Sequence, residues 1–267
     1  MAFQGHTTVD AQLAGHYPDL PDVAGFASRY QRSLLLDVLK PDPSAAPSYG
    51  EWDYGKDAVT ESLLLQAVWE AQESTVAVDI LANHPGVVLD FGAHIGWYTV
   101  LAGVFGAHPV IAFEPEAHMV TALSRNAERY GVDVAYRGSV QRSTSPVEVD
   151  GDVALMKCDI EGMDGYAVDA CADLFEQHRI RFALIEVSPI FYHDGRGPCD
   201  YVEMVRRLMD WGYRVYRIPP KGWEHNDAYR EQPLETLKRY RELGSDWAEV
   251  IAGCRQDNFV FIRDEDV

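Results

Sequence analysis

The chain has 267 residues, of which 47% are hydrophobic, and this is enough to bury the core of one ordinary domain. Its 23 lysine and arginine residues stand against 42 aspartate and glutamate residues, which gives a formal charge of −19. A surface this acidic repels phosphate backbones and anionic lipid, so we expect neither nucleic acid nor a membrane as a partner.

The beginning of the sequence lacks a basic region followed by an apolar run. No stretch approaches the roughly 18 to 20 apolar residues that cross a bilayer, so we expect a cytoplasmic protein. The cysteines are scattered without CxxC spacing, which favours reduced, structural thiols. They are Cys158, Cys171, Cys199 and Cys254.

Residues 1–50 differ in character from the rest of the chain. An amphipathic run from Val23 to Leu39 is followed by a proline-rich loop, Pro41 to Pro47, which cannot continue a helix. We interpret residues 1–50 as an N-terminal helical extension that serves as a lid or an association element, which leaves an oligomer open. The main domain is expected at residues 51–267.

A helix is expected from about Thr60, with apolar residues at spacings of three and four, until Asn83 to Gly86 break the chain. Apolar runs then alternate with helical patterns. The runs predict strands at 87–91, 110–113, 132–136, 153–158, 182–187, 213–217 and 259–262. Helices are expected from about Gly96 and at about 117–130, 164–177 and 200–211. This order predicts a Rossmann-like α/β fold with a seven-stranded, mostly parallel sheet, helices on both faces and ligands at the carboxyl ends of the strands.

The first predicted strand ends in Asp90 and leads into a turn with the spacing Asp-x-Gly-x-x-x-Gly. Gly92 lets the backbone turn tightly and approach a ligand beside Ala93, and Gly96 removes a Cβ where the helix meets the strand. An acid before the first glycine repels a pyrophosphate but suits a ligand that carries an ammonium and a sulfonium. The spacing is not GxGxxG, which makes an NAD-linked dehydrogenase a distant alternative.

The next predicted strand also ends in an acid, in the segment Phe113-Glu114-Pro115. A carboxylate at the tip of this strand can accept hydrogen bonds from both ribose hydroxyls. Asp90 and Glu114 together describe an adenosine without phosphates, and the predicted cofactor is therefore S-adenosylmethionine, with Pro115 beside it. Either acid alone is equally consistent with a solvated strand end.

Three further residues are candidates for cofactor contacts. Ser139, after the third predicted strand, would lie near the adenine, although a turn serine explains it as well. Tyr54 and Glu61 would close over the methionine end of the cofactor. A glutamate in the first turn of a surface helix explains Glu61 equally well.

The fourth predicted strand ends in Lys157-Cys158-Asp159-Ile160-Glu161-Gly162. Asp159 and Glu161 are two residues apart, so an extended backbone would project both to one side, with Lys157 paired to Asp159. Both acids, and His193 beyond the fifth strand, are candidates for a general base. The alternatives are carboxylates that hold the loop and a surface histidine. A magnesium ion on Asp159 and Glu161 is not favoured, because two carboxylates are a thin ligand set, and we predict no metal site.

These motifs resemble the FkbM-type methyltransferase family, which carries an Asp-x-Gly-Ala-Asn-x-Gly turn, a Phe-Glu-Pro and a Lys-x-Asp-x-Glu-Gly segment. They read here as 90–96, 113–115 and 157–162, and the resemblance continues with Ile185-Glu186 and with Asn258, expected before the last strand. It covers roughly residues 50–263. His94 departs from the family's asparagine.

The resemblance implies a class I methyltransferase fold and methylation of a hydroxyl on a sugar, a glycan or a glycosylated small molecule. Two alternatives stay open. The methyl group could go to nitrogen or carbon of a small metabolite, or the domain could be a non-catalytic cofactor-binding scaffold.

Overall fold

The computed structural model describes residues 59, 69–106, 108–193, 195, 197–218 and 241–266. The chain divides into two compact units, Met1–Thr75 with Gly222–Arg239, and Val76–Lys221 with Tyr240–Val267. The sheet belongs to the second unit. The predictions for residues 1–50, for Tyr54 and for Glu61 lie outside the described residues.

The described residues of the second unit form one sheet of eight strands in the order β3-β2-β1-β4-β5-β8-β6-β7. The strands are β1 Val87–Phe91, β2 Val110–Phe113, β3 Val134–Arg137, β4 Val153–Cys158, β5 Ile180–Val187, β6 Tyr213–Arg217, β7 Arg241–Glu242 and β8 Asp257–Arg263. Strands β1 to β5 are parallel, and β8 runs antiparallel to both β5 and β6. The predicted seven-stranded, mostly parallel sheet is confirmed, and the two-residue β7 extends it at one edge.

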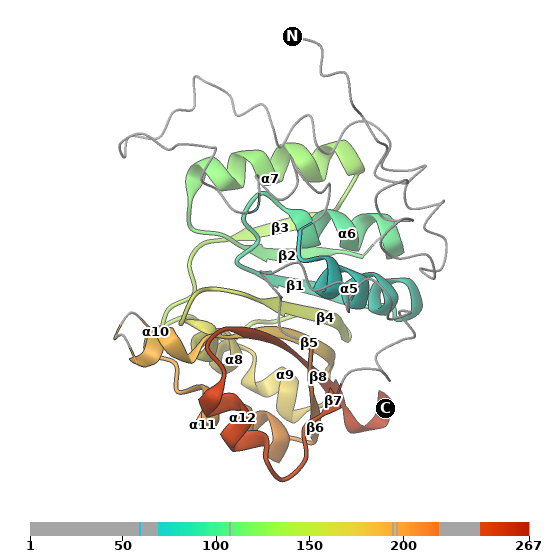
Figure 1. The fold of residues 1–267 in the computed structure, drawn as a ribbon. Helices are drawn as coiled ribbons and strands as arrows, with labels where there is room; N and C mark the ends of the chain where they lie inside the picture. The colour runs from blue at the N-terminus through green and yellow to red at the C-terminus, as the bar shows by residue number, and fades with distance from the viewer. Residues whose placement is uncertain are drawn as a thin grey trace, which may run out of the picture. The chain divides into compact units, whose positions relative to one another are not determined.

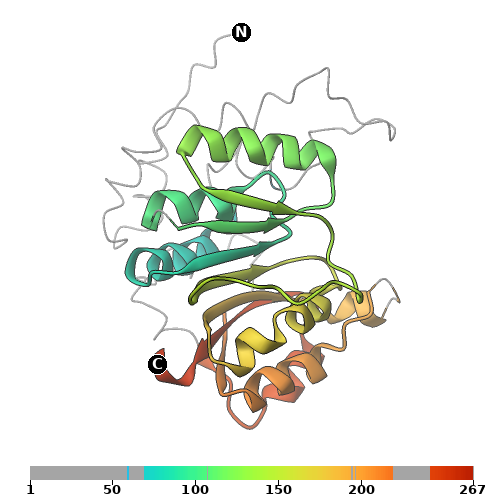
Figure 2. The same cartoon turned by 180° about the vertical axis from the view of Figure 1, so that it is seen from behind.

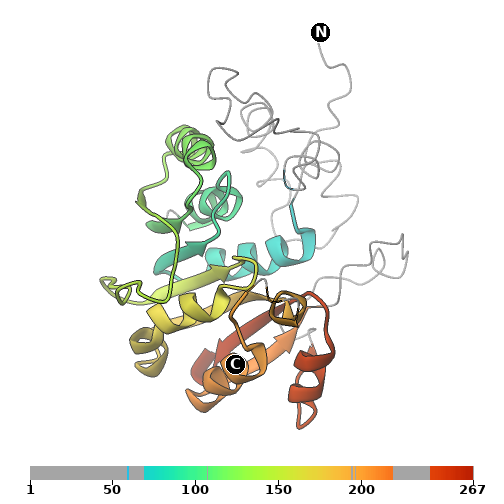
Figure 3. The same ribbon diagram turned by 90° about the vertical axis from the view of Figure 1, so that its left-hand side faces the viewer.

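Helices cover both faces of this sheet, as predicted (Figures 1 and 2). They are α5 Ala71–Asn83, α6 Trp97–Gly106, α7 Ala117–Tyr130, α8 Asp164–Ala170, α9 Ala172–Glu176, α10 Pro189–His193, α11 Tyr201–Asp210 and α12 Trp247–Gly253. Helices α6 and α7 pack together on one side, and α8, α9 and α11 lie on the other. Figure 3 shows the strands between these two groups.

The apolar core follows the alternation of side chains along the strands. On the face covered by α8, α9 and α11, Phe91 and Met156 pack with Phe175 and Val205 in one buried cluster. Polar residues at the alternate positions face α6, where the hydroxyl of Thr99 meets the carboxylate of Asp90. One face of the sheet thus carries this apolar cluster, while the other combines buried apolar residues, such as Val88 and Leu155, with the buried Asp90 and Lys157.

Several predicted elements differ in detail. Strands β5 and β8 each begin two residues earlier than expected, and the helix expected from about Thr60 is interrupted by bends at residues 69 and 70, after which α5 begins at Ala71. Strand β3 begins at Val134 because Gly131 caps α7 in the left-handed conformation, with φ 64°. The predicted helix at 164–177 is two helices, α8 and α9, which meet at Cys171. Asn258, expected before the last strand, lies within β8 opposite Glu186.

Chain order reverses between β1 and β4, which are neighbours in the sheet. In an open α/β sheet, ligands bind at such a switch point, outside the carboxyl ends of the strands. The ends of β1, β2, β4 and β5 all lie at this edge, because these strands are parallel. The predicted site residues that end or follow these strands therefore lie at this edge of the sheet.

All four cysteines are buried free thiols, as predicted. Within the described part of the chain, no helix is both long and apolar enough to cross a membrane.

Candidate functional site

The glycine turn after β1 ties three strands together. The amides of Gly92 and Ala93 donate to the Phe113 carbonyl of β2 at 3.0 and 3.1 Å, and the Asp159 amide donates to the Phe91 carbonyl at 3.0 Å. Gly92 has φ +81°, and an added Cβ would lie 2.0 Å from the Asp159 carbonyl oxygen. Only glycine fits here, because both the backbone angle and the close approach exclude a side chain.

Gly96 is required for a different reason from the one that the sequence suggested. Its φ is +91°, and an added Cβ would lie 2.4 Å from Cδ1 of Leu123 in α7. The interpretation that this glycine relieves contact between a helix and a strand is wrong, since the neighbour is a second helix. Gly96 lets α6 and α7 approach closely.

Asp90 is buried, with 1% of its surface exposed. The hydroxyl of Thr99 donates a 2.6 Å hydrogen bond to Asp90 Oδ2, and Lys157 is the register partner of Asp90 on β4. Burial raises the pKa of Asp90 to about 6, while the Thr99 hydrogen bond and the Lys157 charge oppose this shift. The chain thus holds a carboxyl group near the carboxyl edge of the sheet whose charge changes near pH 6.

Glu114 is fixed through both carboxylate oxygens. Oε2 accepts a hydrogen bond from the His94 amide and Oε1 accepts one from the Glu116 amide, each at 2.9 Å. Each oxygen has further lone-pair capacity for a ligand hydroxyl. His94 takes the left-handed conformation, with φ 52°, which histidine shares with the asparagine usual in the family. The departure at His94 therefore preserves the turn.

Three other predicted cofactor-binding residues lie in the described part of the chain, namely Ala93, Pro115 and Ser139. Ala93 is buried, whereas Pro115 is exposed at the end of β2. Ser139 is exposed two residues after β3, and its hydroxyl accepts a 3.2 Å hydrogen bond from Nε2 of Gln141. The contacts of these residues with a cofactor stay predictions.

Asp159 follows β4 and is partly buried beside Lys157. The predicted pair forms, with 3.4 Å between Lys157 Nζ and Asp159 Oδ2, and the ammonium also lies 5.2 Å from the ring centroid of Tyr98. Glu161 is exposed and has φ 51°, in a turn. The argument that an extended backbone puts Asp159 and Glu161 on one side is therefore wrong, because β4 ends at Cys158.

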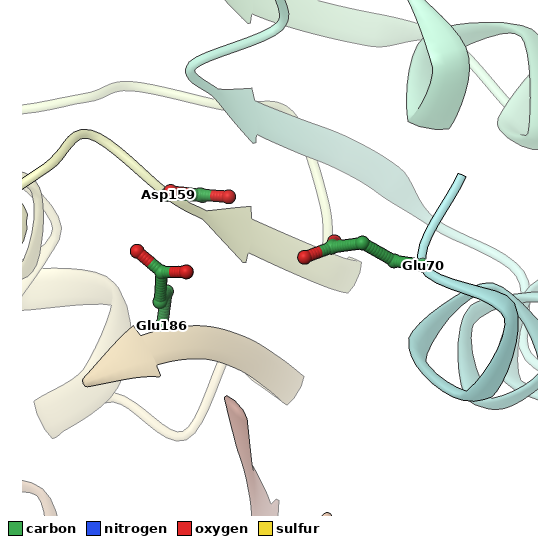
Figure 4. A group of neighbouring side chains, drawn as sticks. All are labelled: Glu70, Asp159 and Glu186. Atoms are coloured by element: carbon green, nitrogen blue, oxygen red, sulfur yellow. The ribbon is translucent and has the colours of Figure 1, made fainter. Parts of the chain in front are cut away.

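Asp159 has an acidic neighbour in Glu186, at the end of the adjacent strand β5. A carboxylate oxygen of each lies within 4.8 Å of the other (Figure 4). Glu186 accepts hydrogen bonds from Ser188 Oγ at 3.0 Å and from Gln256 Nε2 at 2.8 Å. Figure 4 also labels Glu70, which belongs to the first unit. The acidic pair of this edge is Asp159 with Glu186.

His193 is the last residue of the five-residue helix α10, which follows β5 directly. Its ring is exposed and its centroid lies 5.9 Å from that of Tyr192. The structure thus leaves His193 at the correct edge, on an exposed helix end.

Several polar partners in the site escaped the sequence analysis. They are Thr99, Asp164, Ser188, Tyr201 and Gln256, which bond to the acids or hold the loop after β4. Thr99 alone carries a local signal, as a hydroxyl in the first turn of a helix that follows a strand-end acid. Tyr201 and Gln256 lie far along the chain from the carboxylates with which they pair, Ser188 lies in a loop, and Asp164 has the pattern of an ordinary helix start.

The strand order, with β8 antiparallel between β5 and β6, is that of the Rossmann-like class I methyltransferase fold expected from the sequence. The sequence matches no family model, and it matches no curated protein.

Solved structures with a similar fold include three with distant sequences. A cofactor-bound protein from MTB is 16% identical, with a TM-score of 0.48, over 92% of this chain and 98% of that one. A putative O-methyltransferase from Klebsiella pneumoniae is 12% identical, with a TM-score of 0.44, over 91% and 96%. A precorrin-6y C5,15-methyltransferase from Geobacter metallireducens is 13% identical, with a TM-score of 0.43, over 73% and 91%. These likenesses concern the fold alone.

Proposed function

We propose that this chain is a methyltransferase of the FkbM type that uses S-adenosylmethionine to methylate a hydroxyl oxygen of a sugar, a glycan or a glycosylated small molecule. The observation that carries the proposal is the pair of strand-end carboxylates, Asp90 and Glu114. They lie at the ends of two neighbouring parallel strands, and the glycine turn after β1 is hydrogen-bonded to the end of β2. The cofactor, the acceptor class and the role of each residue are parts of this proposal.

The residues present fit the cofactor. Two backbone amides fix the Glu114 carboxylate, which leaves lone pairs on both oxygens for the two ribose hydroxyls. Asp90, when ionised, attracts a ligand that carries an ammonium and a sulfonium and repels a pyrophosphate. S-adenosylmethionine supplies, when bound, a methyl group on a positively charged sulfur.

Transfer forms a bond between the acceptor oxygen and the methyl carbon as the carbon–sulfur bond breaks, and sulfur takes the electron pair of that bond. The hydroxyl proton must pass to a base, and Asp159 is the residue that we favour. It is partly buried and oriented by Lys157, whereas Glu161 and His193, the other candidates, are exposed. Alignment of the reacting atoms can supply about 7 to 11 kcal/mol, and a base typically about 10²- to 10⁴-fold.

The acceptor class is supported by Glu186 beside Asp159 and by an exposed aromatic ring on the helix that follows β5. Glu186 adds a second carboxylate within 4.8 Å, and neighbouring hydroxyls of a sugar are donors that two such groups can bind. Tyr192 of α10 is 46% exposed, and an exposed aromatic ring can stack on the apolar face of a sugar.

The proposal is tested by methyl transfer from labelled S-adenosylmethionine to a panel of sugars, glycans and glycosylated metabolites. We expect transfer by the wild type and a loss of about 100-fold or more in kcat for Asp159→Asn. The kcat should fall less in Glu161→Gln and in His193→Gln. Asp169→Asn, an exposed acid on α8, is the matched control.

Two outcomes would replace the proposal. Cofactor binding without transfer to any acceptor would indicate a non-catalytic scaffold. Methylation confined to nitrogen or carbon acceptors would overturn the oxygen assignment and leave the cofactor assignment standing.

A further inference from the structure

Asp164, the first residue of α8, is 1% exposed and collects four hydrogen bonds. Its Oδ1 accepts from the Ile160 amide at 3.1 Å and from the Cys158 thiol at 3.3 Å. Its Oδ2 accepts from the Gly162 amide at 3.1 Å and from the Tyr201 hydroxyl at 2.6 Å. One buried carboxylate thus holds the last residue of β4 and two residues of the loop that follows it.

These bonds bracket Asp159. Cys158 precedes it and Ile160 follows it, and both are tied to the same oxygen of Asp164. The amide of Asp159 itself donates to Phe91 of β1. The backbone from which the Asp159 side chain projects is therefore fixed on both sides and from β1.

Asp164 accepts its two backbone hydrogen bonds from residues that precede it in the chain, in the loop after β4. A capping side chain would instead accept from the free amides of the first helical turn. The amides that Asp164 binds, Ile160 and Gly162, precede α8. Helix capping therefore does not explain why a carboxylate is buried at this position.

Helix α11 is attached to the same loop. Tyr201 is its first residue, and the amide of Cys199, two residues earlier, donates to the Gly162 carbonyl at 3.2 Å. Gly162 has φ +94°, and an added Cβ would lie 2.9 Å from the Cα of Gly197. The loop after β4 is thus packed between Asp164 and the segment that leads into α11.

Burial of a carboxyl group is costly unless its hydrogen bonds are satisfied. Burial raises the pKa of Asp164, and the hydrogen bond from Tyr201 is the largest influence that lowers it. Tyr201 is itself 2% exposed, so it is a buried donor that meets a buried acceptor.

We propose that Asp164 and Tyr201 form a positioning pair that sets the Asp159 carboxylate for methyl transfer. This inference rests on the proposed function, in which Asp159 accepts the proton of the acceptor hydroxyl. Neither member of the pair touches the substrate. The pair acts by fixing the loop from Cys158 to Gly162.

Two substitutions weaken the pair to different degrees. In Asp164→Asn, the amide nitrogen donates and cannot accept, so two of the four donors lose their acceptor. A misplacement of about 1 Å can cost about 100-fold, and we expect a fall in kcat of about that size. Tyr201→Phe keeps the ring and removes one hydrogen bond, for which we expect about tenfold. The dissociation constant of S-adenosylmethionine should change less than about twofold in either variant.

The chain offers matched controls for both changes. Tyr213 is also 2% exposed, and its hydroxyl also donates a 2.6 Å hydrogen bond, to the Ile180 carbonyl at the opposite end of β5. Tyr213→Phe therefore reports the cost of losing such a bond away from the site. Asp169→Asn makes the same chemical change as Asp164→Asn at an exposed position of α8.

The deciding experiment repeats Asp164→Asn and Tyr201→Phe in an Asp159→Asn background and compares kcat. Residues that act as one unit are non-additive, so we expect little further loss once Asp159 is gone. An equal loss in both backgrounds would overturn the inference, because a general structural role lowers kcat whether or not Asp159 is present. So would a Tyr201→Phe variant that behaves like Tyr213→Phe.

A second readout does not depend on activity. Hydrogen exchange measured by NMR on the full chain should be faster at the Ile160 and Gly162 amides in Asp164→Asn than in the wild type. Unchanged exchange would overturn the inference. If the wild type transfers no methyl group, the proposed function fails, and exchange still decides whether Asp164 holds the loop.

Discussion

The carbonyl oxygen of Asp159 lies 2.0 Å from the place where a Cβ of Gly92 would be. The glycine turn after β1 and the loop after β4 thus approach each other closely through backbone atoms, at the point where chain order reverses in the sheet. Gly92 is required as much by the loop after β4 as by a ligand.

Gly92→Ala should be strongly destabilising. A left-handed backbone costs about 1 to 2 kcal/mol for a residue with a Cβ, and overpacking typically adds about 1 to 3 kcal/mol. Gly131→Ala is the control, because Gly131 also has a positive φ, of +64°, and an added Cβ there meets nothing within 4 Å. In urea denaturation, Gly92→Ala should lose about 1 to 3 kcal/mol more than Gly131→Ala. Equal losses would show that the close approach to Asp159 costs nothing.

Thr99→Val tests the hydrogen bond that orients Asp90. The change nearly preserves shape but removes the 2.6 Å donor and leaves a buried oxygen of Asp90 without it. We expect a loss of about 2 kcal/mol in the free energy of unfolding and weaker binding of S-adenosylmethionine. Thr121→Val on α7 removes an exposed bond to the Ala117 carbonyl and should cost much less. Equal costs would contradict the role of Thr99.

Burial of Asp90 makes a specific contribution to the pH dependence of stability. Because its pKa is raised from 3.8 to about 6, the folded chain binds more protons than the unfolded chain between these values. The contribution of Asp90 to the free energy of unfolding therefore falls as the pH rises through this window, by at most about 3 kcal/mol. Denaturation should show that the free energy of unfolding of the wild type, relative to that of Asp90→Asn, is lower at pH 7 than at pH 4. A constant difference would contradict this.

The same titration should control cofactor affinity. The ionised form of Asp90 attracts a cationic ligand, so the affinity for S-adenosylmethionine should be constant above about pH 7 and fall below about pH 6. Calorimetry from pH 5 to pH 8 measures this, with Asp90→Asn as the variant that lacks the titrating group. A wild-type profile that matches the Asp90→Asn profile would assign the dependence to another group.

Methyl transfer should not require a metal ion. Lys157 already places a cation 3.4 Å from Asp159, and both oxygens of Glu186 accept hydrogen bonds, from Ser188 and Gln256. These neighbours oppose a divalent ion between the two acids. The rate should therefore be the same with a chelator and with added Mg²⁺. A rate abolished by the chelator and restored by Mg²⁺ would make Asp159 and Glu186 metal ligands.

Local patterns predict much of this fold. The bounds of β1, β2, β4, β6 and α7 are those expected, because mostly apolar or alternating runs and a helical period end at turn residues. The shift of β3 came from Gly131, whose cap on α7 occupies residues that the apolar pattern assigns to the strand. The break at Cys171 has no signal in the sequence, since the apolar period continues across it.

The candidate site was predictable from the sequence only where a functional residue stands within a recognisable local motif. Asp90 and Glu114 each end an apolar run, so their shared edge follows from the topology. Asp164 and Tyr201 are 37 residues apart and read as ordinary helix starts, and only packing brings them together. Glu186 was not predicted as a neighbour of Asp159, and the two carboxylates lie within 4.8 Å because adjacent parallel strands bring their ends together.

The most direct test of the account is calorimetric titration of S-adenosylmethionine into the wild type, Asp90→Ala and Glu114→Ala, with and without Mg²⁺. NAD serves as the competing ligand, and Glu128→Gln, an exposed acid on α7, is the control. We predict micromolar binding by the wild type and the control, and a loss of about 10- to 100-fold in each alanine variant. Absence of S-adenosylmethionine binding to the wild type in both conditions, or tighter binding of NAD, would contradict the central claim.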